Sequence, residues 1–244
     1  RAVYSHNDMG ALENVLNNHK DSDRKLIITD GVFSMDGDIA PLDEITNLAE
    51  EHDAMIFVDD CHGEGVLGGG RGIVSHFGLQ GRVNFEVGSY SKALGVQGGI
   101  LAGSEDVRNH ALNHSRSWLL SGSQPPGVAA AQKASIEVLM SEPEHVEKLW
   151  KNTNYFRKEL TSLGFDTGVS TTPIIPVMCG ESIIAQNLSN ELRKEGVMVG
   201  AIVFPMVAAN KARVRTQMSS GISRNDLDLV LSAFEKCGKK IGLI

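Results

Sequence analysis

Residues 54–62 read AMIFVDDCH: an apolar run at 54–58, which predicts a buried strand, followed by two carboxylates, a thiol and an imidazole. Residues 25–31 read KLIITDG: a second predicted strand at 25–29, followed by an acid and a glycine. Between the two runs, Pro41 begins a segment with apolar residues at helical spacing, which extends to about His52. Strand, helix and strand, with uniformly apolar strands, predict an α/β fold whose mostly parallel sheet is covered on both faces.

The same alternation continues along the rest of the chain. Further strands are predicted at residues 83–87, 100–102, 174–178, 197–199 and 213–218, and further helices at 127–140, 144–163, 182–195 and from Ser223 onward. The pattern of elements changes after the predicted helix at 144–163, so we place the boundary where that helix begins. The sequence therefore predicts two domains, an α/β part over residues 1–144 and a smaller α+β part over residues 145–244.

Composition limits the classes of function. The chain has 244 residues, enough to bury a hydrophobic core, and a formal net charge of -7, which argues against binding to nucleic acid. Its longest apolar runs have strand length, so no membrane association is predicted. Three widely spaced cysteines form no disulfide framework, and we therefore expect a cytoplasmic protein.

Polar groups follow three of the predicted parallel strands. Residues 29–38, 59–65 and 88–95 supply carboxylates, an imidazole, hydroxyls and a lysine between glycines. Because ligands of such sheets bind at the carboxyl ends of strands, we expect a site there. Each of these residues, considered alone, also has a purely structural explanation. Asp59 would be a turn residue, His62 a hydrogen-bonded structural histidine and Lys92 a solvated surface lysine. No second ligand pair supports a metal site, and neither a phosphate-binding P-loop nor a nucleophile elbow is present.

Five motifs occur in one order along the chain: HNDM at 6–9, TDGVFSMDGD at 29–38, VDDCH at 58–62, GSYSKALG at 88–95 and RVRTQMS at 213–219. In this order they resemble the motifs of the α-oxoamine synthase family, enzymes that depend on pyridoxal 5'-phosphate (PLP). The resemblance implies the aspartate-aminotransferase-like fold, fold type I. Residues 1–144 would be the C-terminal portion of the large PLP-binding domain and residues 145–244 the small domain, without the N-terminal part of the family fold.

The resemblance also implies roles for individual residues. Lys92 resembles the lysine that holds PLP covalently as a Schiff base and then moves the substrate's α-proton. Asp59 resembles the carboxylate that pairs with the pyridinium nitrogen and keeps the ring an electron sink. His62 and Ser34 resemble residues that contact the phenolic oxygen of the ring.

Three further residues match positions that bind phosphate or substrate in the family. Ser89 stands where the family has a phosphate-binding hydroxyl, and Ser121 resembles a residue that reaches the phosphate of the neighbouring subunit's cofactor. Arg215 resembles the arginine that binds the amino acid carboxylate, which suits a bidentate guanidinium. Gly122 replaces a larger polar residue, and residues 219–223, SSGIS, replace the family's usual SAAHT.

Within the family, residues 238–244, GKKIGLI, and the RTQMS phrase resemble the glycine C-acetyltransferase (2-amino-3-ketobutyrate coenzyme A ligase) branch. This branch predicts a homodimer with shared active sites that joins glycine to acetyl-CoA, giving 2-amino-3-oxobutanoate and CoA, and runs in reverse in threonine degradation. The alternatives are a sibling such as 8-amino-7-oxononanoate synthase, which uses alanine and pimeloyl-CoA, an inactive fragment or partner subunit, and an α/β binding domain without PLP. The sequence also leaves open whether Cys61 is reactive or packed.

Overall fold

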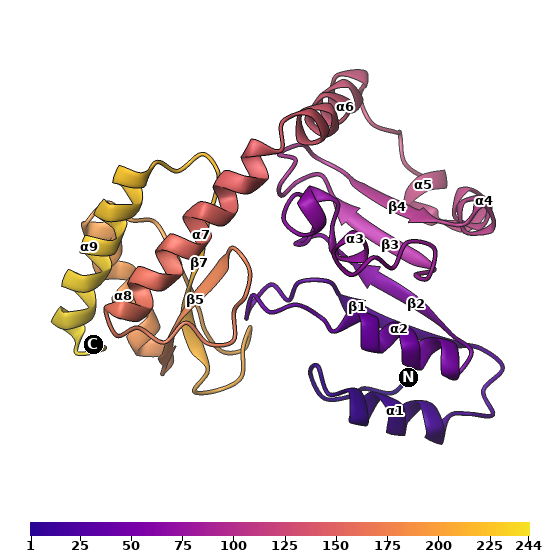
Figure 1. Ribbon diagram of the computed structural model, residues 1–244, viewed down its shortest axis with the longest axis horizontal. Helices are drawn as coiled ribbons and strands as arrows, with labels where there is room; N and C mark the ends of the chain where they lie inside the picture. Colours follow the sequence, from indigo (N-terminus) through magenta and orange to yellow (C-terminus); the bar gives the residue numbers. More distant parts are fainter. The chain divides into compact units, whose positions relative to one another are not determined.

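The computed structural model describes all residues from Arg1 to Ile244 and divides into two compact units (Figure 1). Unit 1 comprises Arg1–Val32 and Ala40–Pro143, and unit 2 comprises Phe33–Ile39 and Glu144–Ile244. A single boundary after residue 144 would assign Phe33–Ile39 to the first part of the chain. The structure corrects this detail, because the segment packs with the second unit.

Unit 1 contains a four-stranded sheet formed by β1 (Lys25–Asp30), β2 (Ala54–Asp59), β3 (Phe85–Ser89) and β4 (Gly99–Gly103). The strands lie in the order β1-β2-β3-β4; the first three are parallel and β4 runs antiparallel to β3. This confirms the predicted mostly parallel sheet. The carboxyl ends of β1, β2 and β3 therefore meet at one edge.

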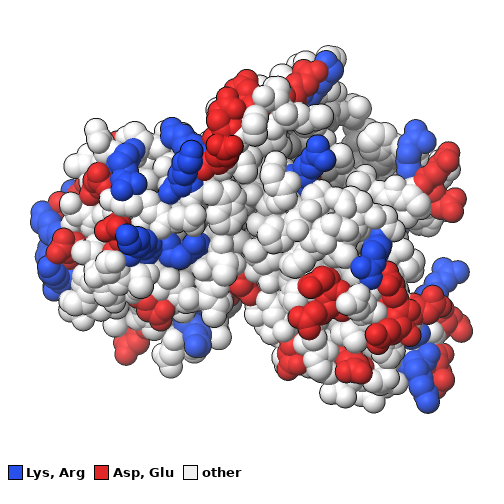
Figure 2. Space-filling view, in the orientation of Figure 1, with Lys and Arg blue, Asp and Glu red and all other residues white.

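The remaining elements of unit 1 are helical. They are α1 (Met9–Asn18), α2 (Leu42–Glu51), the short 3-10 helix η1 (Gly68–Gly70), α3 (Ile73–Phe77), α4 (Glu105–His114), α5 (Arg116–Leu119) and α6 (Pro126–Ser141). Helix α2 packs on β2 and buries Leu42, Ile45 and Ala49 at helical spacing. Acidic side chains gather on the side of unit 1 formed by α1 and α2 (Figure 2).

One face of the β1–β4 sheet is open in this chain. Alternate residues of the strands, such as Ile27 and Ile56, are buried, whereas Leu26, Met55 and Ile28 are exposed, Ile28 to 63%. Successive side chains of a strand point to opposite faces. The prediction of a sheet covered on both faces is therefore wrong for these 244 residues, although its apolar strands have the composition of buried ones.

Unit 2 combines a three-stranded antiparallel sheet with three helices. Its elements are α7 (Glu144–Ser162), β5 (Ile174–Gly180), α8 (Ser182–Lys194), β6 (Gly200–Ile202), β7 (Ala212–Gln217) and α9 (Arg224–Ile241), with strand order β5-β7-β6. The ring of Phe234 meets those of Phe156 and Phe165 edge to face in the core. Ser223 and Asp226 form a reciprocal capping box at the start of α9, as their spacing predicts.

The predicted strand at residues 197–199 is wrong. Val197 N–H donates back to Leu192 O at the end of α8, and Val199 O accepts the hydroxyl of Ser189 at 2.7 Å. Backbone pairing with β7 begins only at Gly200.

None of the helices in the chain combines the length and apolar character needed to cross a membrane.

Candidate active site

Two carboxylates lie side by side where β1 and β2 end. Asp30 and Asp59 are neighbours in the parallel register, and Asp59 Oδ1 accepts the N–H of Cys61 at 3.1 Å. Burial and the adjacent Asp59 raise the pKa of Asp30, whereas the positive charges of Lys92 and His6 act to lower it. This end of the sheet therefore carries excess negative charge close to the lysine.

Lys92 is presented on a turn that is held at both ends. After β3, Tyr90 N–H donates to Gly98 O at 3.0 Å and Val96 N–H donates to Tyr90 O at 2.8 Å. Helix α6 supports the same turn, because the Ser135 hydroxyl donates to Leu94 O at 2.7 Å. The Lys92 side chain is exposed. The fold thus fixes the backbone around this lysine and leaves its amine accessible.

The residues after Asp59 differ sharply in their environment. Asp60 is fully buried and its Oδ2 accepts the Ile73 N–H at 2.7 Å, while its Oδ1 has no hydrogen-bond partner. Burial raises the pKa of Asp60 to about 7. Burial and Asp59 raise the pKa of the half-buried Cys61 thiol to about 11, which is opposite in direction to the lowered pKa of a reactive thiol.

The other predicted residues of unit 1 lie on three different segments. His62 is half-buried directly after Cys61, and the Ser89 hydroxyl lies at the end of β3, 2.7 Å from the Ser91 hydroxyl. Ser121 is exposed beyond α5 and donates to Trp118 O at 3.4 Å. The structure gives no contact of Ser121 with Asp59 or Lys92, so this chain by itself does not bring it to the site.

In unit 2, two arginines on β7 hold the Phe33–Ile39 segment. Arg215 Nε donates to Ser34 O at 2.6 Å, and Arg213 donates to Met35 O at 2.9 Å and forms an ion pair with Asp36. Burial lowers the pKa of Arg215. Its two terminal nitrogens carry no hydrogen bond, so the outer edge of the guanidinium is able to bind a carboxylate.

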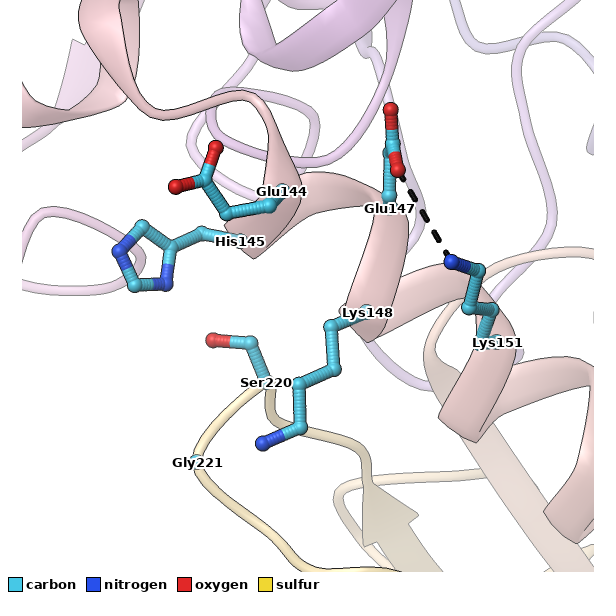
Figure 3. Close-up of a pocket in the computed structure, with 7 residues that line it drawn as sticks. All are labelled: Glu144, His145, Glu147, Lys148, Lys151, Ser220 and Gly221. Carbon is cyan, nitrogen blue, oxygen red and sulfur yellow. Dashed lines mark ion pairs between the residues drawn. The ribbon is translucent and has the colours of Figure 1, made fainter.

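A separate pocket of about 550 Å³ lies in unit 2 (Figure 3). It is lined by Glu144, His145, Glu147, Lys148, Lys151, Ser220 and Gly221. Glu147 and Lys151 form an ion pair across one side at 3.9 Å, and Asn152 holds the adjoining loop by donating to Ser219 O at 2.9 Å. None of the predicted site residues lines this pocket.

Comparison with known proteins places the chain in a family. Residues 2–234 match the family of class I and II aminotransferases, and the chain belongs to this family. A solved serine palmitoyltransferase from S. paucimobilis with bound PLP is 31% identical; it superposes with a TM-score of 0.94 over 99% of this chain and 61% of its own. The predicted fold type I and the PLP cofactor are confirmed.

The curated relatives correct the predicted branch. An 8-amino-7-oxononanoate synthase from Symbiobacterium thermophilum is 52% identical over 99% of this chain, and 8-amino-7-oxononanoate synthase 1 from Bacillus subtilis is 46% identical over 100%. The prediction of glycine C-acetyltransferase activity in threonine degradation is therefore wrong, and the sibling named as its alternative is favoured. The chain spans 62% of the length of each of these relatives.

The residues at the strand ends fit PLP. A pyridinium nitrogen is a cation, and the adjoining carboxyls of Asp30 and Asp59 provide negative charge for one. An exposed lysine amine on a fixed turn is available to an aldehyde. The negative charge of the two carboxyls and the accessible amine of Lys92 thus both suit PLP.

Sequence reasoning placed Asp30 and Glu64 among the polar residues at the strand ends but assigned no role to either. Glu64 accepts the N–H of Ser89 at 2.9 Å, and Asp30 adjoins Asp59. The signal for Glu64 was its place between Gly63 and Gly65, two residues after His62. A carboxylate between two glycines lies on a backbone that approaches its neighbours closely, which is typical of functional loops.

Proposed function

We propose that this chain is the larger part of an α-oxoamine synthase that makes 8-amino-7-oxononanoate from alanine and pimeloyl-CoA. The observation that carries the proposal is the group at one sheet edge, where Asp59, Asp30 and the Lys92 turn lie together. The relatives at 46–52% identity support this choice of product. As a cytoplasmic homodimer with shared active sites, the protein would complete its sites with Ser121.

The numbers of carbon atoms in the substrates and in the product define the reaction. Pimeloyl contributes seven carbons and the product contains nine, so only two of the three alanine carbons remain. The carboxyl carbon therefore leaves as CO₂, and CoA leaves as the thiol. When bound, PLP supplies an aldehyde for an amine and a ring that withdraws electrons from the α-carbon.

Residues of this chain supply the rest. Lys92 would hold the cofactor, and its amine, once free, would move a proton at the substrate α-carbon. Asp59 would supply the negative charge that favours a protonated ring nitrogen, and His62 and Ser34 would bind the phenolic oxygen. Ser89 would bind the phosphate, and Arg215 would bind the alanine carboxylate through the terminal nitrogens that its contact with Ser34 leaves available.

A substrate comparison tests the proposal. The whole purified protein, loaded with PLP, is assayed for CoA thiol release with pimeloyl-CoA or acetyl-CoA, each with alanine or glycine, together with capture of CO₂. We expect pimeloyl-CoA with alanine to give the highest kcat/KM, with one CO₂ released per CoA. Preference for acetyl-CoA, or CoA release without CO₂, would contradict the proposed product.

A further inference from the structure

The loop after β2 packs tightly against the turn that carries Lys92. Glu64 Oε2 accepts the Ser89 N–H at 2.9 Å. This approach requires glycine at position 88, because a Cβ there would lie 1.8 Å from Glu64 Oε1. Glu64 therefore contacts the backbone of β3 itself, three residues before Lys92.

A second contact follows at the next residue. Gly65 has φ of +71°, and a Cβ at this position would lie 2.5 Å from the Cβ of Ala93, the residue after Lys92. The loop thus meets the lysine turn on both sides of Lys92. Glu64 is the side chain in this contact that carries both a hydrogen bond and a charge.

Electrostatics connects Glu64 with the lysine as well. Burial raises the pKa of Glu64, while the Ser89 N–H and the positive charge of Lys92 act to lower it. The charged groups around it are the carboxyls of Asp59, Asp60 and Glu86, and Glu64 contributes to the raised pKa of both Asp60 and Glu86. Lys92 is the cation that interacts with this carboxylate.

We propose that Glu64 is a positioning residue for Lys92: its carboxylate holds the backbone at Ser89 and adds a negative charge to the surroundings of the lysine. The proposal rests on the proposed function, in which Lys92 holds PLP. Glu64 then has two separable effects. The hydrogen bond to Ser89 N–H needs only an acceptor oxygen, whereas the electrostatic effect on Lys92 needs a negative charge.

Two variants of the whole protein separate these effects. Glu64→Gln keeps an acceptor oxygen for Ser89 N–H and removes the charge, and Glu64→Ala removes both. Glu137→Gln, on the exposed surface of α6, is the matched control. The measurements are the absorbance of bound PLP titrated with pH, and the dissociation constant of PLP.

We expect Glu64→Gln to lower the titration midpoint by roughly one pH unit, because removing a negative charge disfavours the protonated nitrogen. Its PLP affinity should stay near that of the wild type. Glu64→Ala should show the same shift and also bind PLP about tenfold more weakly, since the Ser89 N–H loses its acceptor. Glu137→Gln should match the wild type in both measurements.

The inference is overturned if Glu64→Gln titrates like the wild type, or if its PLP affinity falls as far as that of Glu64→Ala. Either result would leave the proposed function intact, provided that the wild type carries PLP on Lys92. A wild-type protein without PLP on Lys92 would contradict both the inference and the proposed function.

Discussion

Two consecutive aspartates at the end of β2 have opposite environments. The Asp59 side chain is partly exposed, whereas Asp60 is fully buried with one oxygen lacking a hydrogen-bond partner. Successive side chains point to opposite faces, so one carboxyl lies at the candidate site and the other is enclosed in the core. A Cβ at Gly31, Gly63 or Gly72 would lie within 2.4 Å of the Asp60 carboxyl, which shows how closely the chain encloses it.

The pKa of Asp60 predicts a pH-dependent stability. In the folded protein its pKa is raised from 3.8 to about 7, with burial as the main cause and Glu86, Glu64 and Asp59 adding to it. The folded state therefore retains a proton that the unfolded state releases. Stability should fall as the pH rises from about 4 to about 7, by a total on the order of 4 kcal/mol, and should stay constant above that range.

Asp60→Asn tests this account, because the amide keeps an acceptor for Ile73 N–H and does not ionise. The melting temperatures of wild type and variant are compared from pH 5 to pH 8. We expect the variant to gain stability relative to the wild type as the pH rises to about 7. Parallel melting curves across this range would show that Asp60 does not titrate there.

At the scale of elements, β7 holds a segment distant in sequence. Arg213, only 3% exposed, and Arg215 are alternate residues of the strand, and both bind the backbone of Phe33–Ile39. Side chains two residues apart on a strand share a face, which allows the pair to bind one segment. The TDGVFSMDGD motif and the RVRTQMS motif thus meet within unit 2.

We predict that Arg213→Met destabilises the protein by roughly 3 kcal/mol. The substitution leaves the Asp36 carboxylate and the carbonyl oxygens of Met35 and Lys211 without their donor. Lys236→Met is the control: its ion pair with Glu195 is exposed, so the loss should stay below about 1 kcal/mol. Urea unfolding of the whole protein measures both changes. Equal losses in the two variants would count against a special role for Arg213.

The sequence predicted the elements whose local signals agree with long-range pairing. Apolar runs bounded by polar turns located β1 and β2 within one residue at each end. The run at residues 197–199 has the same apolar character, yet hydrogen bonds to α8 withdraw it from the sheet. The packing of Phe33–Ile39 with unit 2 depends on contacts across about 180 positions of sequence, which no local pattern reveals.

The sequence supplied candidate site residues, which stay predictions, and it supplied the wrong branch of the family. Lys92, Asp59 and His62 stood out because their motifs occur in order along the chain. The branch was wrong because the GKKIGLI ending and the RTQMS phrase do not report acyl-chain length. That property depends on the shape of a pocket, which residue identities along one chain do not describe.

At the scale of the whole molecule, the main feature is the open face of the β1–β4 sheet, where apolar side chains are exposed to solvent. Leu26, Ile28 and Met55 expose apolar surface beside the strands that end in Asp30 and Asp59. Exposed apolar surface of this kind is typical of interaction sites. Cofactor binding is therefore best measured on the whole protein.

We propose that Lys92 holds PLP, and chemical reduction of the bound cofactor tests this most directly. The whole protein is reduced with borohydride, and its intact mass and peptide map are compared with those of Lys92→Ala. The account predicts one phosphopyridoxyl adduct per chain, on the peptide that contains Lys92, and none in the variant. An adduct on another lysine, or no adduct on a folded wild-type protein supplied with PLP, would contradict it.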